Sequence, residues 1–213
     1  MEQVLVAGAT GTTGNIIINI LKQSEHFTPV AMVRKEEQVK DFKEKGIEAI
    51  LGDLSGKVDH VTKNIDKVIF AAGSKGKDVK GIDKEGAIKL IDASISEGVK
   101  KFVMLSSMGT QDPQSVPELE DYLKAKKAAD HYLMKSNISY TIVRPGSLTN
   151  KKGQGKIDLE KYLDRKGEIS REDVAQTLVK ALDTETANNL AFEILEGHTP
   201  VEQALKQAHE VVA

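Results

Sequence analysis

The stretch Val4-Leu5-Val6-Ala7-Gly8-Ala9-Thr10-Gly11-Thr12-Thr13-Gly14, near the start of the chain, decides the predicted fold. An apolar run ends at a loop with three evenly spaced glycines, and residues 15–23 follow with the apolar spacing of a helix. Between a strand and a helix such a loop binds a pyrophosphate: Gly8 permits a tight turn, Gly11 lets backbone N–H groups approach, and Gly14 lets the helix pack closely. The helix N-terminus adds partial positive charge. An ordinary glycine-rich turn is the alternative; a P-loop is excluded, because no Gly-Lys-Ser/Thr follows.

Strand-like and helix-like segments alternate from this loop onward. The alternation predicts right-handed βαβ units and a parallel sheet covered on both faces, that is, an α/β doubly wound sheet of the Rossmann type. The expected strands are residues 3–7, 29–33, 47–51, 67–72, 101–105 and 139–143, and the expected helices are residues 15–23, 36–45, 83–97 and 118–135.

The last third of the chain gives weaker signals. Ser170-Arg171-Glu172-Asp173 predicts a capping box that opens a helix to about residue 182, and residues 190–195 predict an added strand. Thr199-Pro200-Val201-Glu202 predicts a second capping box, with a helix running to the end of the chain. We expect a single NAD(P)-binding domain, 1–213, with a core over 1–146 and a small substrate-side extension over 147–213.

Composition excludes several classes of protein. The 213 residues carry 30 Lys and Arg against 32 Asp and Glu, a net charge of −2, which argues against a nucleic-acid-binding polycation. The absence of Cys excludes disulfide frameworks, thiolate nucleophiles and Cys-based metal sites. With no signal-peptide pattern and no apolar run near the ~20 residues that span a bilayer, we expect a cytoplasmic protein without membrane or nucleic-acid partners. No metal-ligand spacing is found among the histidines, His26, His60, His131, His198 and His209.

Arg34 bears on the choice of dinucleotide. An NAD site places an acidic residue about 20 positions after the last glycine of the loop. Here that position holds Arg34, followed by Lys35, and the first acids are Glu36 and Glu37. A guanidinium at the end of the second strand would pair with a 2′-phosphate, so NADP is favoured over NAD. A solvated basic pair at a strand end is the alternative.

Tyr122 and Lys126 are spaced by four residues, which places them on one face of a predicted helix in a stripe with Ala129 and Leu133. Packing alone does not explain a lysine on this apolar face, because lysine is seldom buried. It has a role if Tyr122 gives a proton to a carbonyl oxygen, because an ammonium nearby lowers a phenol pKa that is otherwise near ~10. Ser107, at the end of a predicted strand, would hydrogen-bond the same oxygen. Chance spacing on a helix is the alternative.

Together these motifs resemble the extended and atypical short-chain dehydrogenase/reductase (SDR) families over nearly the whole chain. The resemblance implies that Asp53 binds the adenine amino group, that Leu54 packs near the ring, and that Lys126 also holds the nicotinamide ribose. It places the small residues after the fourth strand near the adenosine ribose and Pro145-Gly146 near the nicotinamide. The expected catalytic residues are Ser107, Tyr122 and Lys126, and the expected cofactor-binding residues are Gly8, Thr10, Gly11, Thr12, Thr13, Gly14, Arg34, Asp53, Leu54, Ala71, Ala72, Gly73, Ser106, Lys126, Pro145 and Gly146.

One departure keeps other functions open. In Gly81-Ile82-Asp83-Lys84-Glu85-Gly86, Asp83 stands where extended SDRs usually carry an Asn of the active tetrad. The resemblance is therefore to a small atypical SDR subgroup of epimerases and reductases, and it implies an NADP-dependent oxidoreductase for a small carbonyl or redox substrate. An NADPH sensor with a protein partner and a nucleotide-sugar epimerase or dehydratase are the alternatives. The short segment after Gly146 counts against the latter.

Two basic loops follow predicted strands. Residues 74–80 contain Lys75 and Lys77, and residues 149–156 contain Lys151 and Lys152. Both leave the carboxyl ends of strands, where ligands bind in open α/β sheets. They predict a mobile, positive rim over the nicotinamide end of the cofactor, which attracts an anionic small-molecule substrate. Lysines that only keep the loops solvated are the alternative.

Overall fold

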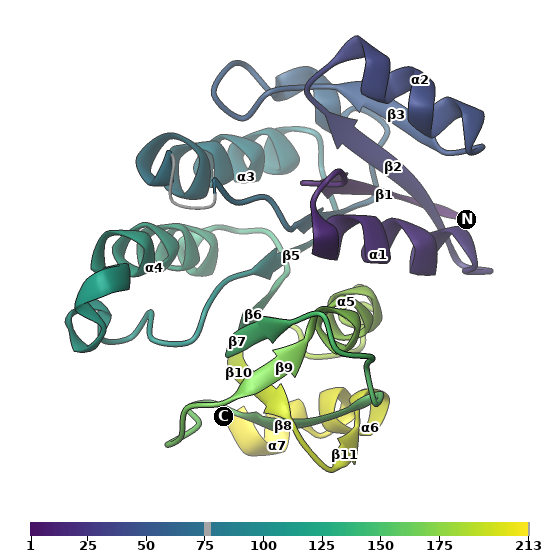
Figure 1. Ribbon diagram of the computed structural model, residues 1–213. Coiled ribbons are helices and arrows are strands. Elements are labelled where there is room, and N and C mark those ends of the chain that lie inside the picture. Colours follow the sequence, from purple (N-terminus) through teal and green to yellow (C-terminus); the bar gives the residue numbers. More distant parts are fainter. Residues whose placement is uncertain (75–77, 213) are drawn as a thin grey trace.

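The computed structural model describes residues 1–74 and 78–212 (Figure 1). The strands are β1 (Glu2–Ala7), β2 (Phe27–Val33), β3 (Glu48–Leu51), β4 (Lys67–Phe70), β5 (Lys101–Leu105), β6 (Tyr140–Pro145), β7 (Ser147–Thr149), β8 (Lys156–Glu160), β9 (Glu168–Ser170), β10 (Leu190–Glu196) and β11 (Thr199–Pro200). The α-helices are α1 (Thr12–Lys22), α2 (Glu36–Glu44), α3 (Ala87–Ser96), α4 (Glu120–Lys135), α5 (Arg171–Lys180), α6 (Val201–Lys206) and α7 (Ala208–Val212). Short helices are η1 (Asp59–Thr62), η3 (Pro113–Ser115) and η4 (Pro117–Leu119), and η2 (Val79–Gly86) is π-helical.

The main sheet has the order β11-β8-β10-β6-β5-β4-β1-β2-β3 among the described residues. From β3 to β10 every pairing is parallel, whereas β8 pairs antiparallel with both β10 and β11. A small second sheet joins β7 and β9 in parallel. The order β3-β2-β1-β4-β5-β6 confirms the doubly wound parallel fold predicted from the alternation of strands and helices.

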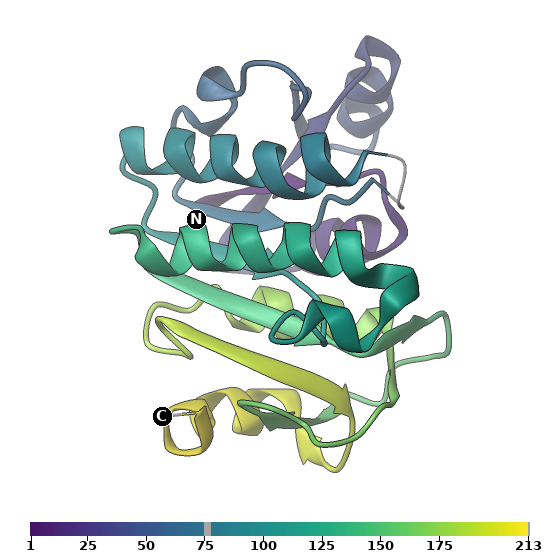
Figure 2. The same ribbon diagram turned by 90° about the vertical axis from the view of Figure 1, so that its left-hand side faces the viewer.

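Helices cover both faces of this sheet (Figures 1 and 2). Val4 and Val6 of β1 belong to a buried cluster with residues of α1, α2, α5 and α6, whereas Leu5 and Ala7 belong to one with residues of α3 and α4. Successive side chains of a strand point to opposite faces, so an uninterrupted apolar strand is the pattern that two covered faces require. The apolar runs quoted above are therefore buried on both sides.

Of the two helix caps predicted in the last third of the chain, one is confirmed and the other is wrong. Ser170 caps α5, because its hydroxyl oxygen accepts from the Asp173 N–H at 2.9 Å. The second box is wrong: α6 begins at Val201 after Pro200, no side chain within this described segment caps it, and a second short helix, α7, ends the described chain. Thr199 instead pairs with Ile157 in the sheet, which takes it out of reach of the helix.

The residues after Gly146 extend the main sheet rather than forming a separate layer. β10 returns to lie beside β6, and β8 lies beyond it. α5 packs against α1, so this region shares the core of the first half of the chain. None of the helices in the described ranges has the length and apolar character that a bilayer crossing requires.

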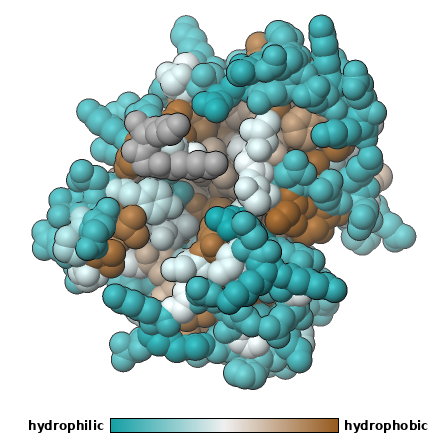
Figure 3. Space-filling model, viewed as in Figure 1, coloured by the Kyte–Doolittle hydropathy of each residue, from teal (hydrophilic) through white to brown (hydrophobic). Residues whose placement is uncertain are grey.

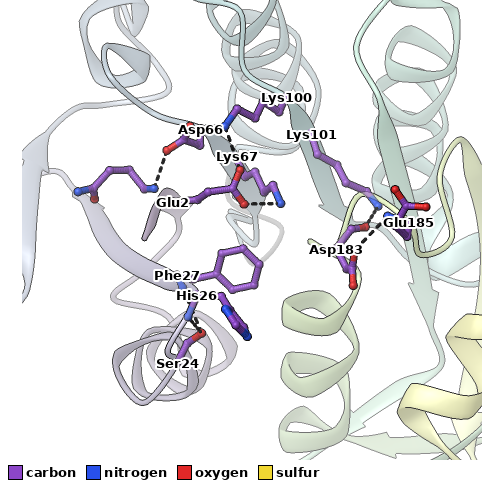
Figure 4. A network of polar contacts seen from close by, with 11 residues as sticks. Glu2, Ser24, His26, Phe27, Asp66, Lys67, Lys100, Lys101, Asp183 and Glu185 are labelled. Carbon is purple, nitrogen blue, oxygen red and sulfur yellow. Dashed lines mark hydrogen bonds and ion pairs between the residues drawn. The ribbon is translucent and has the colours of Figure 1, made fainter.

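Two buried lysines mark the amino-terminal edge of the sheet (Figure 4). Lys67 of β4 and Lys101 of β5 are register partners. The Lys67 ammonium lies 2.7 Å from a carboxylate oxygen of Glu2 and 5.0 Å from the centre of the Phe27 ring. The Lys101 ammonium donates to the carbonyl oxygens of Asp183 and Thr186, at 2.6 and 2.7 Å. Burial, with the charge of Lys67 beside it, lowers the pKa of Lys101 to about 8.

The lowered pKa of Lys101 predicts that the folded protein becomes more stable as the pH rises above about 8. Between pH 8 and 10.5 the unfolded chain keeps a proton on Lys101 that the folded chain has released, so the free energy of unfolding increases with pH, by up to about 3 kcal/mol from this group. Urea unfolding at pH 7, 8, 9 and 10 measures the increase. Lys101→Met is the control, because it removes this titration and leaves the other groups in place. Parallel pH curves for the two proteins would contradict the prediction.

Candidate functional site

The candidate site lies at the carboxyl ends of β1 and β4, where the sheet reverses its winding. The chain leaves β1 for α1 on one face and leaves β4 for α3 on the other (Figure 1). The two outgoing segments diverge and leave a crevice, which is where ligands bind in doubly wound sheets. Figure 3 faces this edge: residues of intermediate hydropathy lie at its centre beside hydrophobic patches, and mainly hydrophilic residues surround them.

The glycines of the first loop are required by close backbone contacts. Gly8 has φ +92°, and a Cβ there would lie 2.7 Å from backbone atoms of Ala71 and Ala72. A Cβ on Gly14 would lie 2.1 Å from the carbonyl oxygen of Gly8. A Cβ on Gly11 would lie 3.2 Å from the same oxygen, a close contact that a small shift of the neighbouring atoms could relieve. The loop thus packs flat against the end of β4 and leaves the start of α1 accessible.

The first turn of α1 has the donors that an anionic group needs. Gly11 is its N-cap and offers no side chain, and the turn, all of it described, contains no acidic residue. Thr12 is exposed and Thr13 is buried at this turn. The first N–H groups of a helix lack intrahelical acceptors and carry partial positive charge. The cradle of glycines and these open amides fit a dinucleotide pyrophosphate.

Arg34 and Asp53 lie at the ends of the neighbouring strands β2 and β3. Arg34 is exposed, and its positive charge acts on Asp53. The pKa of Asp53 is lowered chiefly by hydrogen bonds from the N–H and hydroxyl of Ser55, at 2.9 and 2.8 Å, with Arg34 and Lys89 adding to the effect. Asp53 therefore stays charged, as a turn former with one carboxylate oxygen engaged by Ser55.

Lys126 lies between the ends of two central strands. Its side chain is 2 % exposed, its ammonium donates to the Leu105 carbonyl at 2.7 Å, and it lies 5.7 Å from the centre of the Phe70 ring. Tyr122 is half-buried one turn earlier on the same face of α4. Ser107 follows the end of β5 by two residues and donates to the Met108 carbonyl at 3.1 Å. The chain thus brings Lys126 and Ser107 to the end of β5, with Tyr122 one turn from Lys126 along α4.

Ser106 has a different orientation from its neighbour. It is buried, and its hydroxyl donates to a carboxylate oxygen of Asp130 at 3.0 Å, the same oxygen that accepts from Arg144 Nε at 2.9 Å. Burial raises the pKa of Asp130, although Arg144, Ser106 and Lys126 favour its charged form. Sequence reasoning missed Asp130; the signal was its place four residues after Lys126 on the buried stripe of α4.

Asp83 of η2 is held beside the loop after β4. One of its carboxylate oxygens accepts from the N–H and the hydroxyl of Ser74, at 3.0 and 2.7 Å. The other is buried without a partner among the described residues, and a Cβ on Gly73 would lie 3.2 Å from it. Asp83 therefore fixes the path of the chain beyond Gly73.

The remaining predicted residues occupy the same edge of the sheet. Leu54 is buried and packs against Gly86, where a Cβ would lie 2.8 Å from it. The Gly146 N–H donates to the Ile194 carbonyl oxygen of β10 at 3.1 Å, which ties Pro145-Gly146, at the end of β6, to β10. Thr10 is exposed at the tip of the glycine loop. No cluster of three His, Asp or Glu side chains suited to a metal ion is found in residues 1–74 and 78–212.

The described part of the predicted basic rim lies beside α1. Lys151 forms an ion pair with Glu168 at 2.8 Å. Lys151 and Lys152 line a groove of about 640 Å³ that also contains Thr12 and Arg171. Lys75 and Lys77 lie outside the described residues. The lysines of the second loop thus share a groove that runs along α1 from Thr12 to Gln23.

The comparisons with known proteins agree with this geometry. Residues 8–185 match the model of a family described as NAD(P)H-binding. An uncharacterized sugar epimerase of Bacillus subtilis is 38% identical over 96% of this chain and 99% of its own. A structure from Bacillus halodurans, named provisionally as an NAD-dependent epimerase/dehydratase, is 37% identical, with a TM-score of 0.92 over 97% of this chain and 100% of its own. Sanguinarine reductase of Eschscholzia californica is 29% identical over 90% of this chain and 88% of its own.

Proposed function

Because the chain belongs to the NAD(P)H-binding family, we propose that it is an NADP-dependent oxidoreductase of the SDR type, acting on a small carbonyl or related redox substrate. The observation that carries the proposal is the buried Lys126, 2.7 Å from the end of β5 and one helical turn from Tyr122. Lysine is seldom buried without a polar function. The name of sanguinarine reductase supports reduction as the class of reaction.

The carboxyl edge of the sheet supplies the groups that would hold the cofactor. The amides at the start of α1 and the loop of Gly8, Gly11 and Gly14 would bind the pyrophosphate. Arg34 would pair with the 2′-phosphate, and Asp53 would reach the adenine. Ala71, Ala72 and Gly73 would lie close to the adenosine ribose, and Pro145-Gly146 would lie close to the nicotinamide. When bound, NADPH supplies the hydride.

Tyr122 and Ser107 would handle the substrate oxygen. Ser107 would hydrogen-bond the oxygen and orient it toward Tyr122. Tyr122 would give it a proton, helped by the positive charge of Lys126 one turn away, because an ammonium favours the phenolate that remains. Lys151 and Lys152, in the groove along α1, would favour an anionic substrate.

A screen of carbonyls, quinones and flavins for oxidation of NADPH by the purified protein tests the proposed reaction. We expect at least one class to be turned over with NADPH consumed in proportion. Tight NADPH binding with no turnover would favour a sensor instead. A sugar epimerase, the function named in the Bacillus subtilis relative, would convert a nucleotide sugar without net consumption of cofactor.

Arg34→Ala tests the choice of NADP over NAD. We expect wild type to bind NADPH roughly 10–150-fold more tightly than NADH, because a hydrogen bond to a charged group contributes about 1.5–3 kcal/mol. The variant should lose most of this preference and keep its NADH affinity. Calorimetric titration of both cofactors measures it, with Lys35→Ala as the matched control, since Lys35 pairs with Glu37 at 3.1 Å. Equal affinities in wild type would contradict the assignment.

A further inference from the structure

A second concave site lies on the α4 face of the sheet, away from the glycine loop. It is a groove of about 270 Å³, here called the α4 groove, over β6 and the start of β10. Figure 2 shows α4 in front of the sheet with β10 below it, uncovered on this face by any described helix. The groove is lined by Thr110, Gln111, Lys127, His131, Met134, Tyr140, Arg144, Lys161, Tyr162, Asn189, Leu190, Ala191 and Val212.

The charged groups that line the α4 groove are basic. Lys127, Arg144 and Lys161 line it together with His131, and no acidic residue is part of the described lining. Two carboxylates lie beneath: Asp130 holds Arg144, and Glu193 is buried while accepting from Gln111 and from the Leu163 N–H. Arg144 balances the charge of Asp130, whereas Glu193 is held by neutral donors and offsets one of the two lysines, so the lining keeps a net positive charge on its open side.

Two buried polar side chains line the groove. Thr110 is 1 % exposed, and its hydroxyl oxygen is enclosed without a hydrogen-bond partner within the described residues. Arg144 is 7 % exposed, and the hydrogen bond that the described residues give it is at Nε, to Asp130. The Nη groups of Arg144 are therefore the donors that a ligand in the groove would engage.

Apolar side chains form the rest of the wall. Tyr162 and Met134 stand at the groove with 54% and 42% of their surfaces exposed, and Leu190 and Val212 also line it. Large apolar side chains that flank a concave site mark a surface that a ligand covers. A flat apolar body would lie against these side chains while a charged end meets the basic ones.

We infer that the α4 groove binds a small organic anion with a planar apolar body, separate from the dinucleotide crevice. The anionic group meets Arg144, Lys127 and Lys161. The body lies against Met134 and Tyr162. The Asp130 oxygen that accepts from Arg144 also accepts from Ser106, which precedes Ser107. A ligand bound to Arg144 would therefore be connected through Asp130 to the residues at the end of β5.

Calorimetric titration of the full-length protein with 1-naphthoate and with 1-naphthalenemethanol tests the inference, because the two probes share a ring system and differ in charge. We expect one naphthoate site, with the alcohol bound about tenfold more weakly or worse. Saturating NADPH should leave naphthoate binding within twofold of its value without cofactor. Equal binding of the two probes, no binding of naphthoate, or displacement by NADPH would overturn the inference.

Variants locate the site independently of the cofactor. The double substitution Lys127→Gln with Lys161→Gln should weaken naphthoate about threefold to fivefold and leave the alcohol unchanged. Lys124→Gln is the matched control, because Lys124 lies on the same helix and pairs with Glu120. Unchanged naphthoate binding in the double variant would place the probe elsewhere and refute the assignment. These readouts stand even if the protein proves not to be an oxidoreductase.

Discussion

Tyr122→Phe is expected to lower kcat by about 10²- to 10⁴-fold on any substrate that the NADPH screen identifies, with NADPH affinity little changed. The variant keeps the ring and loses only the hydroxyl that donates the proton. The buried Lys126 remains in place, since its hydrogen bond is to the Leu105 carbonyl. Steady-state kinetics and NADPH titration together make the measurement.

Tyr132→Phe is the matched control for this substitution. Tyr132 lies on the same helix, and its hydroxyl donates to Asp92 at 2.6 Å on the protein surface. It should keep wild-type kcat. Lys126→Ala should differ from both, because the SDR resemblance gives this lysine a contact with the nicotinamide ribose as well, so NADPH affinity and kcat fall together. Near-full turnover in Tyr122→Phe would mean that another group protonates the substrate.

Gly14→Ala is expected to abolish measurable NADPH binding and to destabilise the protein. A Cβ at this position would lie 2.1 Å from the Gly8 carbonyl oxygen. Because this oxygen belongs to the backbone, it cannot move away by a change of side-chain rotamer. The first turn of α1 must move away from β1, which costs about 3 kcal/mol, at the upper end for an overpacked site. For a domain of this size that lowers the melting temperature by roughly 6–12 °C. Thermal unfolding and NADPH titration test both effects.

Gly56→Ala controls for the general effect of replacing glycine. Gly56 has no positive φ, and its nearest contact to an added Cβ is at 3.5 Å, which is ordinary van der Waals contact. We expect its melting temperature and NADPH affinity to match those of wild type. If Gly14→Ala behaves like Gly56→Ala, the loop has room to adjust and the packing argument fails.

Local patterns predicted the first half of the fold well, for identifiable reasons. The strand before Gly8, the glycine loop and α1 each have a strong signal of their own, and the three agree. The burial of Lys126 also followed from a local pattern, the four-residue spacing with Tyr122 and the apolar residues one and two turns later. Such signals need no knowledge of distant parts of the chain.

Other features depend on contacts far apart in sequence and were missed. β7, β8, β9 and β11 are short, and each exists because a partner strand from elsewhere lies beside it. The partner of Asp130 is Arg144 on β6, which no local pattern around Asp130 indicates. Thr199 had the composition of a helix cap, but pairing with β8 determined its position. The π-helical turn of η2 gave no sequence signal that we recognised.

The place of β10 has a consequence for synthesis on the ribosome. β10 lies between β6 and β8, although it emerges after both. While residues 190–196 are still missing from the nascent chain, one backbone edge of β6 is unpaired, and an open edge of an apolar strand is a template for association with other chains. A translational pause in the segment between β6 and β10 would prolong this exposure of the β6 edge.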